Sequence, residues 1–315
     1  MTPVFELDNV TKRFGRFTAL DGISFHGDPG RVIALLGDNG AGKTTSLKIL
    51  LGLLNPDQGQ ARVFGLDSRK QGWEIRRRVG YMADKPALYD WMTVAEIGWF
   101  AAGFYPLGFQ DRYRQLIQKF ELPTDRKLSK LSKGMLAKVA LSLSLAHEPQ
   151  LLVLDEPTSG LDPVVRREFL ESMVDVAATG RTVLLSSHQI GEVERVADDV
   201  VILRGGRVVL NESLESIKNS IREVILTRVE ATSVPPTGAD LGQILSSRQH
   251  DRQWRLLVKG ADEDALQLWT ATGEFLDVDF RTPSLEEICV GYLTSHASSG
   301  HESNAAVSAP EGGSR

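Results

Sequence analysis

The clearest chemistry in this sequence lies in one glycine-rich segment, Gly37-Asp38-Asn39-Gly40-Ala41-Gly42-Lys43-Thr44-Thr45. The apolar run 31–36 before it favours a buried strand, and the apolar spacing of 46–52 after it favours a helix. Strand, glycine loop and helix in this order form the context of a phosphate-binding loop. Glycines let backbone N–H groups converge on an anion, and the unpaired N–H groups of a helix start point at the same place.

This segment therefore predicts a site for a nucleoside triphosphate. Lys43 would reach the β- and γ-phosphates, because its ammonium group follows the last glycine of the loop. The hydroxyl of Thr44 would ligate Mg²⁺, which prefers oxygen ligands.

Two carboxylates and a histidine follow later apolar runs. Asp155 and Glu156 come directly after the run 151–154, at the carboxyl end of a predicted strand, where open α/β sheets hold their ligands. Asp155 is placed to position Mg²⁺ and Glu156 to polarise an attacking water, and catalysis of phosphoryl transfer rests mostly on such positioning. His188 follows the predicted strand 182–185 and could donate to the γ-phosphate, whereas a structural role is the alternative for a lone histidine.

Two aromatic features have both a structural and a functional interpretation. Phe14 stands before a predicted turn at Gly15, where it could pack in the core or stack on a purine. Thr93 and Glu96 have the spacing of a capping box, and the helix that they begin is unusually rich in aromatic residues. That helix could be local core or a docking surface for another protein, and the residues alone leave both interpretations open.

The elements that must position these residues follow an alternating pattern. Strands that alternate with helices over roughly the first 215 residues predict a mostly parallel α/β sheet. Around residue 220 the pattern changes to short strands and helices, so we expect an ATP-handling domain over 1–219 and a small α+β domain over 220–295. The tail 296–315 is rich in Ser, Gly, Ala and Pro without apolar periodicity, and we expect it to be disordered.

Composition narrows the choice of partners and compartment. With 36 Lys and Arg against 41 Asp and Glu, the net charge of −5 provides no overall basic field, so no nucleic acid partner is expected. The single cysteine, Cys289, excludes an internal disulfide and fits a reducing cytosol. No run of 18 or more apolar residues occurs, and the first residues lack the pattern of a signal peptide, so a cytoplasmic protein is expected.

One further motif, Leu131-Ser132-Lys133-Gly134-Met135, stands about twenty residues before the run that ends at Glu156. With it, the motifs resemble in order and spacing those of the nucleotide-binding subunits of ABC transporters, over about residues 4–215. The resemblance identifies Gly37–Thr45 as the Walker A loop, Leu151–Asp155 as the Walker B strand and Glu156 as the catalytic carboxylate. It further identifies a D-loop at Ser159–Asp162, a switch histidine at His188 and an adenine-stacking aromatic at Phe14.

The resemblance implies a fold and a mechanism. The fold would be a P-loop NTPase of ABC type, with a mixed core sheet, an antiparallel β subdomain and a helical subdomain at about 86–148. The activity would be ATP hydrolysis with ATP and Mg²⁺, coupled to export through a separate permease at the cytoplasmic face of the cell membrane. Two such subunits, identical or paralogous, would close head to tail, so that Ser132, Gly134 and Asp162 of one chain complete the site of the other. The aromatic segment 89–100 would then dock onto the permease.

Two motifs depart from the pattern of the family. Lys133 and Met135 stand where the common signature Leu-Ser-Gly-Gly-Gln has its first Gly and its Gln, while Ser132 and Gly134 are kept, and variants of the form Leu-Ser-x-Gly-Met occur in bacterial ABC-2-type exporters. Asp84 stands where the Q-loop has Gln or Glu, as a candidate ligand of Mg²⁺ or the attacking water, although its side chain is shorter and charged. A slow-turnover, ATP-binding switch is therefore one alternative.

Another alternative is a soluble ABC ATPase that acts on ribosomes or nucleic acid. Such proteins usually carry a long coiled coil between the motifs or a second ATPase domain, and the sequence shows neither. The residues from 220 resemble the small appended domain of ABC-2-type ATPases, mainly at Pro283–Ile288. Dimerisation or regulation, and passive stabilisation, are both open as roles of that domain.

Overall fold

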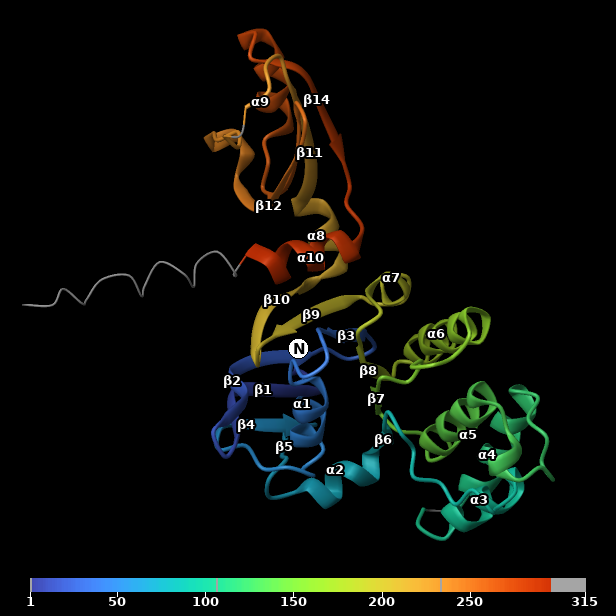
Figure 1. The fold of residues 1–315 in the computed structure, drawn as a ribbon. Coiled ribbons are helices and arrows are strands. Elements are labelled where there is room, and N and C mark those ends of the chain that lie inside the picture. Colours follow the sequence, from blue (N-terminus) through green and yellow to red (C-terminus); the bar gives the residue numbers. More distant parts are fainter. Residues whose placement is uncertain (1, 106, 233, 296–315) are drawn as a thin grey trace, which may run out of the picture. The chain divides into compact units, whose positions relative to one another are not determined.

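The computed structural model describes residues 2–105, 107–232 and 234–295, and the predicted disorder of 296–315 lies outside them. The chain forms two compact units, Met1–Leu214 and Glu215–Arg315, drawn as the blue-to-yellow and yellow-to-red parts of Figure 1. The division thus falls five residues before the boundary expected at 219/220.

A six-stranded sheet in the order β10-β9-β3-β8-β7-β6 forms the centre of the first unit. Its strands pair in parallel except for β10, which runs antiparallel to β9, so the predicted mixed sheet is confirmed. Strands β3, β7 and β8 are buried along their whole length, which explains their continuous apolar runs. The strands are β3 (Val32–Leu36), β6 (Val79–Met82), β7 (Leu151–Asp155), β8 (Thr182–Ser187), β9 (Asp199–Arg204) and β10 (Arg207–Ser213).

The register of this sheet decides where the candidate residues lie. Leu36 at the end of β3 pairs with Ser187 of β8, and Asp155 at the end of β7 pairs with Ser186 of β8. Because parallel strands end at the same edge, the loops that follow β3, β7 and β8 begin side by side. The loop after β3 leads into α1 (Lys43–Leu50).

An antiparallel sheet in the order β2-β1-β4-β5 supports the first unit beside α1 (Figure 1). Strands β1 and β2 form a hairpin whose turn at Gly15 places Phe14 opposite Phe17. The core between the sheets and α1 is apolar and includes Phe5, Leu47 and Val153. The strands are β1 (Phe5–Phe14), β2 (Phe17–Gly27), β4 (Gln58–Val63) and β5 (Leu66–Asp67).

A helical part of the first unit has an apolar core of its own, which includes Val94, Tyr113 and Val139. Thr93 and Glu96 form the predicted capping box, with the Thr93 hydroxyl 3.2 Å from the Glu96 backbone nitrogen. None of the helices that the structure describes is long and apolar enough to cross a membrane. The helices of this unit after α1 are α2 (Gly72–Arg78), α3 (Val94–Ala102), α4 (Phe109–Lys119), α5 (Lys133–Leu145), α6 (Pro163–Ala178) and α7 (Ile190–Val193), with a 3₁₀ turn at Leu128–Lys130.

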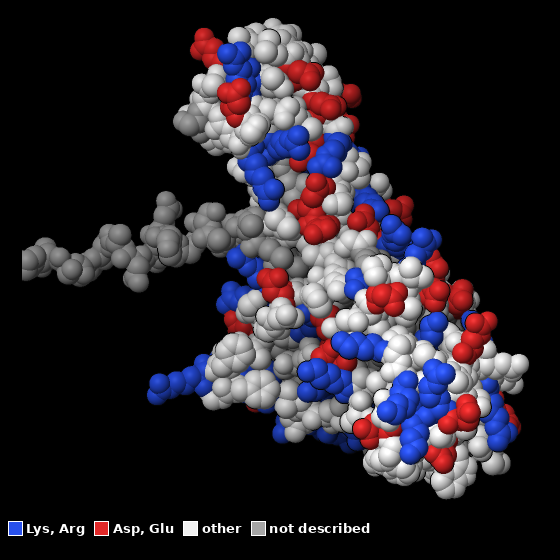
Figure 2. All heavy atoms as spheres, turned by 45° about the vertical axis from the view of Figure 1, so that its right-hand side comes forward, with Lys and Arg blue, Asp and Glu red and all other residues white. Residues whose placement is uncertain are grey.

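Basic residues gather in and just before α2, at Arg69, Lys70 and 76–78. Arg76 donates to the carbonyl oxygen of Leu51, and the Arg78 guanidinium lies 4.1 Å from the ring centroid of Phe64. On the face that Figure 2 displays, blue cations and red carboxylates are interspersed. Arg76 and Arg78 thus have structural contacts within the first unit.

The second unit is an antiparallel sheet in the order β12-β13-β11-β14 with short helices. Its core includes Val224, Trp254 and Val278, and Cys289 is buried. The segment after β13 is α-helical from Glu263 to Gln267 and then continues as a 3₁₀ turn. The elements are α8 (Leu214–Ser220), β11 (Ile221–Arg228), β12 (Gln243–His250), β13 (Gln253–Lys259), α9 (Glu263–Gln267), β14 (Phe275–Arg281) and α10 (Leu285–Ser295), with 3₁₀ turns at Ala239–Leu241 and Leu268–Thr272.

Candidate functional site

The glycine-rich loop between β3 and α1 has a backbone that only glycine suits. Gly37, Gly40 and Gly42 have φ values of 150°, 83° and 108°, a region that side chains with a Cβ rarely adopt. A Cβ at Gly37 would overlap the carbonyl oxygen of Leu203, and one at Gly42 would lie 2.8 Å from the carbonyl oxygen of Ala19. The loop is therefore tightly packed against its neighbours and has little freedom to change shape.

Lys43 points its ammonium group back into this loop. Its Nζ donates to the carbonyl oxygens of Gly37 at 2.6 Å and Asp38 at 3.3 Å. The same atom lies 3.0 Å from Glu156 Oε1, and the lysine side chain is only 6% exposed. Because a buried charge is costly without a partner, the loop and the carboxylate together hold this cation in place.

Thr44 and Asp155 meet at the start of α1. The Thr44 hydroxyl lies 3.0 Å and 2.8 Å from the two carboxylate oxygens of Asp155. A hydroxyl and a carboxylate are the oxygen donors that suit Mg²⁺, which usually takes one or two protein oxygens and fills its shell with phosphate and water. Among the described residues no group of three or more His, Cys, Asp or Glu could hold a metal by itself. These two residues therefore fit Mg²⁺.

Glu156, which follows β7, contacts one residue after β3 and one after β8. Its Oε1 faces Lys43, and its Oε2 lies 2.7 Å from His188 Nδ1. The side chain of Glu156 is 14% exposed and that of His188 is 40% exposed, so the pair lies where the buried edge of the sheet meets solvent. A carboxylate held on both oxygens in this way is well oriented to accept a proton from a water molecule.

A buried serine that the sequence analysis did not single out joins this group. Ser186, the last but one residue of β8, lies with its hydroxyl 2.7 Å from Asp155 Oδ1. The backbone nitrogen of Glu156 lies 3.0 Å from the same hydroxyl. The signal available in the sequence was two serines between an apolar strand and His188, which is too common a pattern to identify either of them.

Asp84 lies apart from the other candidate residues. It is exposed, in a bend after β6, and within the described ranges no hydrogen bond or ion pair joins it to Thr44, Asp155 or Glu156. Burial, followed by the charge of Asp155, raises the pKa of Tyr81 on β6 to about 12.

Phe14 is a surface residue, so the interpretation as core is wrong. Its side chain is 50% exposed, with the ammonium group of Lys12 5.5 Å from the ring centroid. Phe17, across the turn of the hairpin, is 60% exposed and was not singled out from the sequence. Both rings are thus exposed enough to contact a ligand. The sequence pattern that could have identified Phe17 is an aromatic residue on each side of the turn at Gly15.

The signature segment contacts the D-loop rather than the glycine-rich loop. Ser132 caps α5 by accepting from a backbone N–H three residues on, and Asp162 caps α6 through the N–H of Val165. A Cβ at Gly134 would come within 2.7 Å of Val165, so α5 and α6 begin in close contact. In the part of the chain described, no hydrogen bond or ion pair joins these residues to Gly37–Thr45, and Figure 1 shows α1 and α5 on different sides of β6.

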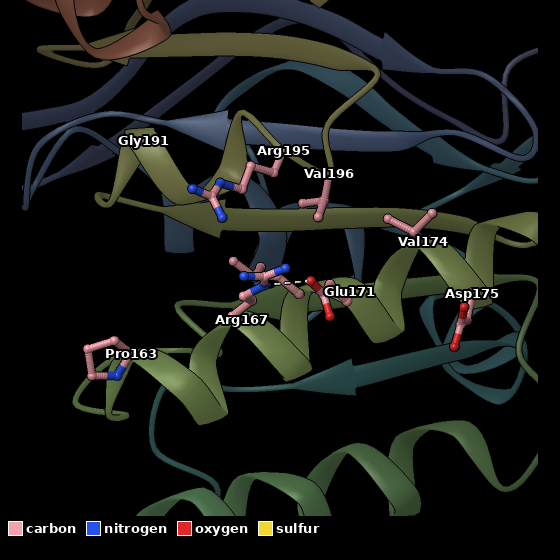
Figure 3. Close-up of a pocket in the computed structure, with 9 residues that line it drawn as sticks. Pro163, Arg167, Glu171, Val174, Asp175, Gly191, Arg195 and Val196 are labelled. Atoms are coloured by element: carbon pink, nitrogen blue, oxygen red, sulfur yellow. Dashed lines mark hydrogen bonds and ion pairs between the residues drawn. The ribbon is translucent and has the colours of Figure 1, made fainter.

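A pocket of about 570 Å³ lies elsewhere, along α6 and the segment 191–196 (Figure 3). Within it Arg167 and Glu171 face each other at 2.7 Å and neutralise one another. Its lining consists of Pro163, Arg167, Leu170, Glu171, Val174, Asp175, Gly191, Arg195 and Val196. None of the candidate residues lines it, so this pocket is separate from the site built around Lys43.

Comparison with known proteins places these motifs in a family. Residues 20–159 match the family model described as ABC transporter. The chain is 31% identical over 315 residues to the daunorubicin resistance ATP-binding protein DrrA2 of Streptomyces coeruleorubidus, an alignment that covers 95% of this chain and 97% of that protein. It is also 36% identical over 220 residues to the probable multidrug ABC transporter ATP-binding protein YbhF of Escherichia coli, covering 68% of this chain and only 38% of that relative.

A solved structure described as the ATP binding subunit of an ABC transporter superposes with a TM-score of 0.63 at 32% identity, covering 69% of this chain and 92% of the other. The structural likeness confirms the predicted fold of ABC type. Because the match to DrrA2 extends over almost the whole of both proteins, the family is shown along with the fold. This chain belongs to the ATP-binding proteins of ABC transporters.

Proposed function

We propose that this chain binds and hydrolyses ATP with Mg²⁺ and thereby drives export through a separate membrane permease. The observation that carries the proposal is the convergence of Lys43, Glu156 and His188 at one edge of the sheet. The names of its relatives, a multidrug transporter component and a daunorubicin resistance protein, support export as the direction of transport.

The contacts of Lys43 suggest how ATP binding prepares hydrolysis. The phosphates of ATP would be received by backbone N–H groups of Gly37–Thr45 and by the start of α1, and they would draw the ammonium group of Lys43 toward them. Glu156 then loses its cationic partner but keeps His188, which orients its carboxylate toward a water molecule. Mg²⁺, held by Thr44 and Asp155, would supply positive charge to the phosphate oxygens. With both ring nitrogens protonated, His188 would also donate to the γ-phosphate through Nε2 once the site is closed, since Nδ1 faces Glu156.

A second copy or a paralogue would complete the site. Ser132 is exposed at the start of α5 and, in the described residues, has no bond to the phosphate-binding loop of its own chain. A helix start and a hydroxyl suit an anion, and the anion available in a head-to-tail dimer is the γ-phosphate bound by the other chain. We propose that Ser132, Gly134 and Asp162 act there, and that Phe14 stacks on the adenine of its own chain.

Exposed aromatic residues support docking on the permease. Tyr89 is 49%, Trp91 60%, Trp99 66% and Phe104 72% exposed, whereas Val94 of the same segment is fully buried. Tyr89 and Trp91 contact one another, with 6.0 Å between their ring centroids, and Tyr89 and Phe104 both contact Phe100. We propose that this aromatic patch binds the permease at the cytoplasmic face of the membrane, because clustered exposed aromatics are typical of protein interfaces.

The test is replacement of Glu156 by Gln, which keeps the shape of the side chain but removes its charge and basicity. Glu156→Gln should bind ATP with unchanged affinity and lose at least about a hundredfold in kcat, the range that a general base contributes. The matched control is Glu171→Gln, since Glu171 is exposed on α6 and pairs with Arg167 away from the site. Hydrolysis by Glu156→Gln at the rate of Glu171→Gln would refute the assigned role of Glu156.

A further inference from the structure

Ser186 is a buried polar group that the proposed mechanism does not use. It lies near the end of β8, next to β7 in the sheet, and none of its surface is exposed. Its hydroxyl contacts the two residues to which the mechanism assigns the metal and the water, being 2.7 Å from Asp155 Oδ1 and 3.0 Å from the Glu156 backbone nitrogen.

The donors and acceptors in this arrangement can be assigned without ambiguity. The backbone N–H of Glu156 can only donate, so the Ser186 hydroxyl must accept there. A hydroxyl has a single proton, which leaves that proton for Asp155 Oδ1. Asp155 therefore receives hydrogen bonds from Ser186 and Thr44, and its carboxylate is fixed from both sides.

The backbone of Glu156 needs such support. Its φ of 49° lies in the left-handed region, which is unfavourable for a residue with a Cβ and persists only where surrounding contacts determine it. Its N–H is bonded to both the hydroxyl and the carbonyl oxygen of Ser186, the latter at 3.2 Å. Two residues further along, His188 contacts the Glu156 side chain. The end of β8 thus holds Glu156 by backbone and side chain together.

We propose that Ser186 is a positioning residue for ATP hydrolysis, whose hydroxyl locks the Asp155 carboxylate and the strained Glu156 backbone into one fixed arrangement. The inference rests on the proposed roles of Asp155 and Glu156. Ser186 contacts Asp155 and Glu156 rather than the phosphate-binding loop. Its loss should therefore lower the rate of hydrolysis and the affinity for Mg²⁺, and leave ATP binding by Lys43 and the loop unchanged.

The experiment compares Ser186→Ala with wild type in the full chain, by ATP affinity, kcat, and the Mg²⁺ concentration that half-saturates the thermal shift caused by ATP. The alanine removes both hydroxyl bonds, but the Glu156 N–H keeps the Ser186 carbonyl, so the fold should survive. ATP affinity measured without metal should stay within about twofold, while kcat falls by roughly tenfold, the factor expected for a hydrogen bond to a charged group. The half-saturating Mg²⁺ concentration should rise by at least about threefold on the same ground.

Two further variants separate positioning from mere stability. Ser186→Thr keeps the hydroxyl and should recover most of kcat. The matched control is Ser142→Ala, because Ser142 is equally buried but bonds the Lys138 carbonyl within α5, and it should change Tm without changing the Mg²⁺ requirement.

Two results would overturn the proposal. One is a kcat and a Mg²⁺ requirement for Ser186→Ala equal to those of Ser142→Ala, and the other is a failure of Ser186→Thr, when folded, to recover activity. Glu156→Gln is measured in parallel. If it hydrolyses ATP normally, the proposed function fails, whereas a dead Glu156→Gln beside a normal Ser186→Ala refutes this inference alone.

Discussion

At the scale of single residues, the centre of the site is an ion pair between the largely buried side chains of Lys43 and Glu156. Lys43 is the first residue of α1 and Glu156 directly follows β7, and the two charges lie 3.0 Å apart. A buried ion pair of this kind adds little net stability, since desolvation offsets most of the attraction. It does set the side chains in place, so the arrival of a triphosphate changes the surroundings of Lys43 and Glu156 at once.

Replacement of Lys43 tests the phosphate-binding assignment. Lys43→Ala should weaken ATP binding by roughly ten- to a hundredfold, because a charge-assisted hydrogen bond is worth about 1.5–3 kcal/mol. Binding can be followed by the fluorescence of a labelled nucleotide. Lys48→Ala is the matched control, since Lys48 lies on the same helix and is exposed. Equal affinities of the two variants would contradict the assignment.

The residue types of the site were predictable from the sequence, but their contacts were not. The loop, the two carboxylates and His188 were found because spacing after apolar runs marks strand ends. The contact of Lys43 with Glu156 and the bonds of Ser186 depend on strand order, which no local pattern encodes. The exposure of Phe14 likewise follows from the hairpin register rather than from its own neighbours.

At the scale of elements, the strands were easier to predict than the helix starts. Buried parallel strands are continuous apolar runs and stand out, as β3, β7 and β8 do. Helix α2 begins only at Gly72, because the Asp67 carboxylate accepts from the backbone nitrogens of Arg69 and Lys70. A local side-chain bond of this kind replaces the first turn of a helix with a bend.

The aromatic patch of the helical part gives a prediction at the same scale. The double variant Trp91→Ser with Trp99→Ser should remain folded, because both side chains are more than half exposed. Its membrane-bound fraction should fall by more than about tenfold, since aromatic anchors at interfaces are worth about 2 kcal/mol or more. The measurement is co-sedimentation with membranes from cells that make the permease.

The control for this measurement is Trp73→Ser. Trp73 lies on α2, outside the aromatic patch, and is 67% exposed. Membrane binding by the double variant equal to that of Trp73→Ser would refute the docking role of the patch.

At the scale of the whole molecule, the chain holds one phosphate-binding loop and one signature segment. The loop contacts Asp155 at the end of β7 and Glu156 directly after it, whereas the signature contacts α6 and the D-loop. That the signature segment and the phosphate-binding loop of one chain have no contact was predictable only through the resemblance to a family, because no local sequence pattern shows which segments are in contact. It favours a site that is shared between two chains.

Sedimentation of Glu156→Gln tests this shared site most directly. Without nucleotide the variant should sediment with the mass of one chain, 34.6 kDa, and with saturating Mg²⁺ and ATP with twice that mass. Adding Ser132→Arg, which changes an exposed residue with no described bond to the loop, should return it to a monomer with unchanged ATP affinity. A dimer that persists in the double variant, or a Glu156→Gln chain that stays monomeric with ATP bound, would contradict the account.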